Sequence, residues 1–138
     1  SMVFGPKGDL YIDSVDNNIY RIDGDTGENL GVFASHELLL RPAGILFDSE
    51  GNLYIGSAGR DMVLKFDGTT GEFINVFTKG GPLQTPWQLA FGPSGDLYVA
   101  SSGNNKVLIY DGVTGKFDRT FVDGGPLELP NGLVFYAP

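Results

Sequence analysis

The chain has 138 residues, of which 41% are hydrophobic and 19% charged, so it can build one ordinary hydrophobic core. Its net charge of −8 would repel a phosphate backbone, which argues against nucleic-acid binding. The absence of cysteine excludes disulfides, thiolate metal sites and cysteine nucleophiles, and no apolar run approaches the ~20 residues that would span a membrane.

The chain opens on Ser1-Met2, which is typical of a cloning remnant, and no signal peptide is visible. A natural signal sequence would then have been removed. The lack of cysteine does not settle the compartment, because many secreted β proteins also lack it. We expect a secreted or periplasmic location.

One nine-residue stretch occurs three times, at Phe4–Ile12, Phe47–Ile55 and Phe91–Val99. The phenylalanines of the last two copies are 44 residues apart, and Phe135 follows after the same interval. We therefore divide the single segment 1–138 into repeats at approximately 4–46, 47–90 and 91–134. The first repeat is one residue shorter, in the loop that follows its Leu-Tyr-Ile run.

Each repeat predicts four short strands, named A to D. In the third repeat these strands are expected at Gln88–Phe91, Leu97–Ser101, Lys106–Tyr110 and Phe117–Val122. A Gly-Pro-Ser-Gly-Asp turn joins strands A and B, and an Asp-Gly hairpin signal joins strands C and D. The chain begins near the end of an equivalent strand A, at Met2-Val3-Phe4, and a spare strand A is expected at 131–135.

The predicted strands B and C are apolar on both faces, as in Leu97–Ala100 and Val107–Tyr110. Such strands are buried on both sides, which an isolated four-stranded sheet cannot achieve. A ring of sheets achieves it, and a period of ~40–50 residues with four strands is typical of a β-propeller. We predict an all-β propeller with three four-stranded blades per chain, because a β-sandwich would not explain the fixed period.

Residues at equivalent repeat positions are expected to be buried between blades. They are Phe47, Phe91, Leu53, Leu97, Tyr54, Tyr98, Phe77 and Phe121.

The motif at Pro86–Val99, followed by Asn105–Asp111, resembles the NHL repeat and its YncE-like and SMP-30-like relatives. The resemblance covers all three repeats. It implies a propeller that binds proteins, peptides or other ligands. It also leaves open an enzyme, because some relatives are metal-dependent lactonases or lyases.

A recognition surface is expected where the repeats differ from one another, because loops carry function on a fixed scaffold. The B–C loops and the residues after the crossover prolines vary, and in a meander both lie at the same end of the blades. Our candidates for ligand binding at this rim or at the axis are Arg41, Trp87, Gln88 and Asn131. Trp87 would either stack on a ligand or fill the mouth of the channel.

Asn131 stands in Pro130-Asn131-Gly132-Leu133, which resembles a segment of SMP-30-type lactonases whose asparagine helps to hold a divalent metal. Asp13 and Asp16 lie in another oxygen-rich loop. Calcium is the cation that such oxygens would hold, but it requires six to eight of them, and Asp and Asn more commonly cap turns. We therefore expect no cofactor. The single histidine, His36, is expected in a surface loop.

The preferred interpretation is a non-enzymatic binding or scaffold module that recognises a protein or a small molecule. The alternative is a metal-dependent lactonase-like or lyase-like enzyme. A third interpretation is a truncated or engineered piece of a longer propeller that assembles into a ring.

Three blades are too few to close a ring at normal spacing, since propellers have about 4–8. We therefore predict a homodimer with six blades, in which the spare strand of one copy completes the first blade of the other. The expected interface residues are Phe4, Leu10, Tyr11, Leu133 and Phe135.

Overall fold

The computed structural model describes residues 1–136, which form twelve strands in three antiparallel sheets and one short 3₁₀ turn. We call each sheet a blade. Blade 1 contains β1 (Met2–Phe4), β2 (Leu10–Asp13), β3 (Ile19–Ile22) and β4 (Asn29–Ala34). Blade 2 contains β5 (Pro42–Phe47), β6 (Leu53–Ser57), β7 (Met62–Phe66) and β8 (Phe73–Val76). Blade 3 contains β9 (Pro86–Phe91), β10 (Leu97–Ser101), η1 (Ser102–Asn104), β11 (Lys106–Tyr110) and β12 (Phe117–Asp123).

These elements confirm the all-β prediction and its strand positions. In blade 3, strands B and C match the prediction, strand A begins two residues earlier at Pro86, and strand D ends one residue later at Asp123. No helix in residues 1–136 is long and apolar enough to cross a bilayer.

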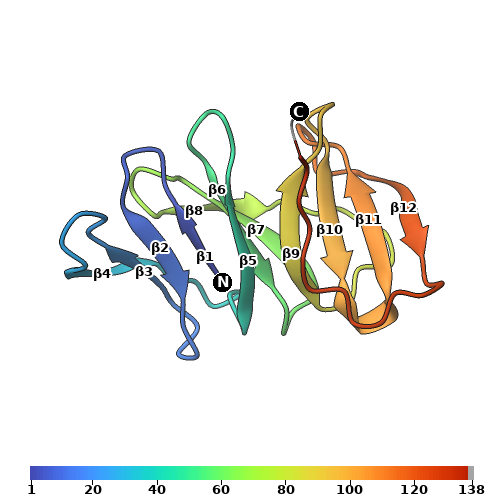
Figure 1. Cartoon of the computed structure of the whole chain (residues 1–138), viewed down its shortest axis with the longest axis horizontal. Coiled ribbons are helices and arrows are strands. Elements are labelled where there is room, and N and C mark those ends of the chain that lie inside the picture. Colours follow the sequence, from blue (N-terminus) through green and yellow to red (C-terminus); the bar gives the residue numbers. More distant parts are fainter. Residues whose placement is uncertain (137–138) are drawn as a thin grey trace.

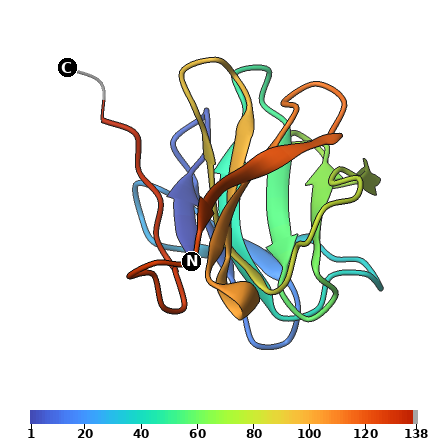
Figure 2. The same cartoon turned by 90° about the vertical axis from the view of Figure 1, so that its right-hand side faces the viewer.

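Each blade is a meander in which consecutive strands pair, in the order β1-β2-β3-β4 and its two equivalents. The blades stand side by side, and their first strands converge, with β5 in contact with both β1 and β9 (Figure 1). Because the first strands converge, strand A is the innermost strand of each blade. In blade 3 the outermost strand, β12, crosses the other strands obliquely in the turned view (Figure 2).

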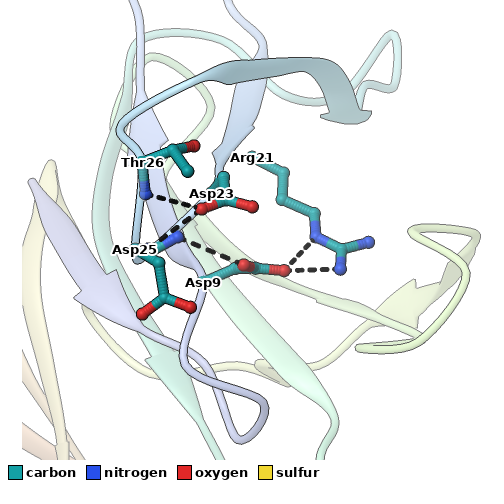
Figure 3. A network of polar contacts seen from close by, with 6 residues as sticks. Asp9, Arg21, Asp23, Asp25 and Thr26 are labelled. Atoms are coloured by element: carbon teal, nitrogen blue, oxygen red, sulfur yellow. Dashed lines mark hydrogen bonds and ion pairs between the residues drawn. The ribbon is translucent and has the colours of Figure 1, made fainter.

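At one end of the blades, which we call the turn face, each A–B turn packs against the C–D turn of the same blade. The approach is so close that a Cβ on Gly68 would lie 1.6 Å from the carbonyl oxygen of Gly51. In blade 1 the A–B turn is also bonded to β3, because Arg21 Nε donates to Asp9 Oδ2 at 2.6 Å (Figure 3). Asp23 Oδ1 accepts the Thr26 N–H at 2.7 Å, and this bond holds the pKa of Asp23 below its usual range.

At the opposite end, which we call the loop face, each crossover between blades is attached to the preceding B–C loop. Arg41, Thr85 and Leu129 all have positive φ and directly precede a proline. Their N–H groups donate to a side-chain oxygen of a second positive-φ residue 24 positions earlier, each at 2.8 Å. The three acceptors are Asn17, Asp61 and Asn105. We call this repeated contact the latch.

Between blades, a strand B tyrosine is packed by two phenylalanines in edge-to-face geometry. Tyr54 lies 4.9 Å from Phe77 in its own blade and 5.3 Å from Phe91 on the next innermost strand. Tyr11 has the same relation to Phe33 and Phe47, at 4.8 and 4.9 Å. Aromatic pairs of this kind add about 0.5–1.5 kcal/mol each beyond the area that they bury.

Most of the predicted core is confirmed. Leu53, Leu97, Tyr54 and Phe77 are buried, and Phe47, Phe91 and Tyr98 are half-buried. The prediction for Phe121 was wrong. It is 55% exposed, whereas Phe77 at the same repeat position is 3% exposed. The reason is that blade 2 has blade 3 beside it, while no sheet formed by residues 1–136 covers the outer face of blade 3.

The predicted spare strand at Asn131–Phe135 has no pairing partner within residues 1–136, and these residues follow an irregular path there. A strand requires a neighbour for its N–H and C=O groups, and no fourth strand B is present among residues 1–136 to supply one.

Two valines offer a matched test of the core. Val63 is fully buried in β7, while Val113 on a C–D turn is 89% exposed. Val63→Ala should lower the free energy of unfolding by about 1.5–3 kcal/mol, through lost methyl burial and the cavity that remains. Val113→Ala should change it by less than about 0.5 kcal/mol. Urea melts would measure both, and equal losses would contradict this core.

Candidate functional site

The loop face carries a shallow recess of about 270 Å³, which we call the rim recess. Blade 1 supplies Asp13, Ser14 and Val15, and the first strands of the next two blades supply Pro42 and Trp87 together with the adjacent Arg41. The structure thus brings together two of the predicted ligand-binding residues, Arg41 and Trp87, and the predicted metal candidate Asp13. Trp87 is 39% exposed, so part of its ring is open to solvent.

The two charged side chains of the rim recess differ in whether they have an ionic partner. Asp13 Oδ1 accepts a hydrogen bond from the N-terminal amino group of Ser1 at 2.8 Å, and this ion pair partly neutralises the carboxylate. Arg41 is exposed, and its guanidinium makes no ion pair within residues 1–136. A ligand at the rim recess would therefore meet an available guanidinium and the apolar surface of an indole.

Gln88 lies elsewhere, in a larger recess of about 720 Å³ that we call the axial recess. Its walls come from β1, β5 and β9, from turn-face residues of blades 2 and 3, and from the C-terminal segment. The turn-face and C-terminal residues include Glu50, Gly95, Val113, Leu133, Val134 and Phe135. This is the place where the innermost strands converge, so Gln88 faces the axis rather than the rim. Asn131 is exposed on the C-terminal segment and lines neither recess.

The oxygen-rich loop of blade 1 uses its side chains within the chain. Asp16 accepts the Tyr20 hydroxyl at 2.7 Å and the Asn18 N–H at 3.2 Å. The bond from Tyr20 is the main cause that holds the pKa of Asp16 below its usual range. Asn17 is engaged in the latch. Among residues 1–136, no three His, Cys, Asp or Glu side chains converge as a metal site would require.

His36 also has a local role. Its ring is stacked on Phe73 at 3.8 Å between centroids, and Nδ1 accepts the Leu38 N–H at 3.1 Å. The stack holds the crossover from blade 1 to blade 2 against β8, while the hydrogen bond stabilises the turn within the crossover. His36 thus lies in a loop, as expected from the sequence, and is half-buried there.

The latch residues were missed by sequence reasoning. A signal was present, because Asn17, Asp61 and Asn105 recur every 44 residues, as do the prolines 42, 86 and 130. Asn and Asp are the side chains that most readily adopt positive φ while also accepting a backbone hydrogen bond. The latch holds Thr85, which directly precedes the start of β9 and lies two residues before Trp87, and in this way it positions the rim recess.

No family model matches the chain, and no curated protein matches it. Among solved structures, a nidogen/laminin complex is similar with a TM-score of 0.71 and 23% identity, over 88% of this chain and 46% of that one. Hydrazine synthase of Kuenenia stuttgartiensis is similar with a TM-score of 0.73 and 22% identity, over 91% and 36%. A protein of unknown function from Bacteroides caccae is similar with a TM-score of 0.66 and 16% identity, over 86% of this chain and 47% of that one.

At these identities the likeness concerns the fold alone. Together with three convergent meander sheets, it shows that the chain has the β-propeller fold. The chain spans less than half the length of each of these structures. The narrower resemblance to NHL-type propellers stays a prediction.

Asp61 tests whether the latch holds the crossover. Asp61→Ala removes the acceptor of the Thr85 N–H and places alanine at a φ of 55°. It should lower the free energy of unfolding by about 1–3 kcal/mol and shift the emission of the only tryptophan, Trp87.

Asp61→Asn is the matched control, because asparagine stands at this position in the other two repeats. It should keep the stability of the parent chain within about 0.5 kcal/mol. The latch would be unimportant if both variants melted like the parent chain.

Proposed function

We propose that the chain is a non-enzymatic, NHL-like propeller module that binds a protein or small-molecule ligand at the loop face. The observation that carries the proposal is the convergence of Arg41, Trp87 and Asp13 on one recess at the end where the repeats diverge. The turn face has the opposite character, because its turns are nearly constant in sequence and closed by backbone contacts.

The chemistry of the rim recess favours a peptide-like ligand. A partly exposed indole packs against apolar or aromatic groups, while an available guanidinium pairs with a carboxylate or a carbonyl oxygen. Tryptophan and arginine are also the residues that most often dominate binding energy at interfaces. No nucleic-acid or membrane partner is proposed, in keeping with the net charge of −8.

The same chain is proposed to close a six-bladed ring with a second copy. Phe4 and Phe121 support this, with 65% and 55% of their surface exposed, because their repeat equivalents at internal blade junctions are half-buried or buried. A head-to-tail second copy would supply at each end the neighbour that the internal blades already have. Such a ring would complete the wall around the axial recess.

Ligand binding at the loop face can be tested with a phage-displayed library of random peptides of about twelve residues. Peptides selected on the parent chain should bind Trp87→Ala and Arg41→Ala at least about tenfold more weakly, as expected for interface anchors. Ile74→Ala, on the outermost strand β8 and outside both recesses, should bind them like the parent chain. Peptides that are indifferent to Trp87 and Arg41 would overturn the assignment.

The enzyme alternative is tested by metal binding. Isothermal titration with Ca²⁺ and Zn²⁺ should show no stoichiometric site at micromolar concentration, because the Asp16 and Asn17 oxygens already accept internal hydrogen bonds. The control is Asn75→Ala, which changes an asparagine in β8. A submicromolar metal site that is lost in Asn131→Ala but kept in Asn75→Ala would contradict the binding-module proposal and favour the lactonase-like alternative.

A further inference from the structure

The C-terminal residues Pro130–Phe135, which we call the tail, lie where the innermost strand of a fourth blade would stand. Phe135 packs edge-to-face on Tyr98, with centroids 4.8 Å apart and planes at 72°. Phe47 on Tyr11 and Phe91 on Tyr54 make the same contact, at 4.9 and 5.3 Å. In both of those pairs the phenylalanine belongs to an innermost strand. The tail runs beside blade 3 and lines the axial recess together with β9 (Figure 1).

The start of the tail is also placed as the start of an innermost strand. Leu129 has a φ of 46°, and its N–H donates to Asn105 Oδ1 at 2.8 Å, which is the third copy of the latch. The first two copies of the latch lead into β5 and β9. The tail is therefore held at both ends in the position of an innermost strand, although no strand pairs with it.

Blade 1 offers the complementary position. Its innermost strand β1 has three residues, whereas β5 and β9 have six each and extend to Ser57 and Ser101 at the end of strand B. Beyond Met2, the end of β2 adjoins the rim recess, which Asp13 and Ser14 line. Ser1 adds one backbone bond to β2, because its carbonyl oxygen accepts the Asp13 N–H at 3.2 Å. The two positions that match Pro42 and Ala43 have no counterpart opposite Ser14 within residues 1–136.

The serine at the end of strand B marks where an incoming crossover docks. Ser57 Oγ accepts the Leu40 N–H at 2.9 Å and donates to the Leu38 carbonyl oxygen at 2.7 Å. Ser101 Oγ accepts the Gln84 N–H at 2.9 Å and donates to its carbonyl oxygen at 3.1 Å. Ser14 stands 43 residues before Ser57, and no crossover reaches it within residues 1–136.

We propose that the tail of one copy replaces Met2–Phe4 of a second copy as the innermost strand of blade 1. This inference rests on the ring closure proposed above and states how the two ring junctions form. The register follows from the internal blades, where Phe47 and Phe91 stand opposite Leu53 and Leu97. It places Phe135 opposite Leu10 of the second copy and Leu133 opposite Ile12.

The exchange replaces the three residues of β1 by up to six, and it satisfies backbone groups of the tail that have no backbone partner within residues 1–136. It also places Glu128, which is 44 residues after Gln84, where its main chain can bond Ser14 of the second copy. Asn131 then enters the rim recess of that copy, so each recess is completed by a residue from the other chain.

Two phenylalanines at the same repeat position distinguish exchange from simple face-to-face docking. In the exchange, Phe135 of the tail packs in blade 1 of the second copy. Phe4 belongs to β1, which is displaced, so its side chain contributes nothing to the contact between the two copies. Phe135→Ala should weaken the dimer at least about tenfold by sedimentation equilibrium, whereas Phe4→Ala should leave it unchanged or strengthen it. If both substitutions weaken the dimer equally, β1 stays in place and the exchange is wrong.

Disulfide trapping gives an independent readout, because the chain has no cysteine of its own. In the exchanged dimer, Ile12→Cys in one chain should crosslink to Leu133→Cys in another and give a covalent dimer on oxidation. The control places Met2→Cys and Ile12→Cys in one chain, since these residues face each other in β1 and β2. An intrachain bond in the control under dimeric conditions would overturn the exchange.

The mass of the parent chain separates the two proposals. A mass of one chain would refute the ring closure itself, and the exchange would fall with it. A mass of two chains with the wrong pattern of substitutions or crosslinks would refute the exchange and leave the ring intact.

Discussion

The structure depends on the packing of one blade against the next, because strands B and C are apolar on both faces. In blade 2, both strands are almost completely buried, and only neighbours on both sides make this possible. The edge-to-face contacts of Tyr11 and Tyr54 repeat this packing at each internal junction. Where the neighbour is missing, equivalent side chains such as Phe4 and Phe121 are exposed. The burial of these side chains therefore depends on the neighbouring blade and not on the blade that carries them.

The two ends of the blades are constrained in different ways. On the turn face, backbone approaches such as Gly68 to the Gly51 carbonyl oxygen leave no room for a side chain, so the repeats are nearly identical there. On the loop face, the latch requires only one side-chain oxygen and one N–H group. The remaining loop positions are free to vary, and this is why Arg41 and Trp87 can gather on a recess without disturbing the fold.

The latch also connects the fold to the proposed assembly. It directs each crossover into the position of the next innermost strand, and it does so after blade 3 as well, at Leu129. The tail is thus pre-positioned in the single chain, so pairing with a second copy would require little further ordering. Binding and assembly meet at the rim recess, where Asn131 of one copy would join Arg41 and Trp87 of the other.

The sequence by itself determined the strand positions, the turns and the blade count, because a fixed 44-residue period and Gly-Pro and Asp-Gly turns impose local geometry. It also identified Arg41, Trp87 and Asp13 individually. Only the tertiary structure decided that these three share one recess while Gln88 faces the axis, because their proximity arises from the convergence of three blades. The exposure of Phe121 and the unpaired path of the tail were likewise decided by tertiary structure. A residue or strand at the end of a repeat array has the same sequence signals as its internal equivalents, but it lacks their neighbour.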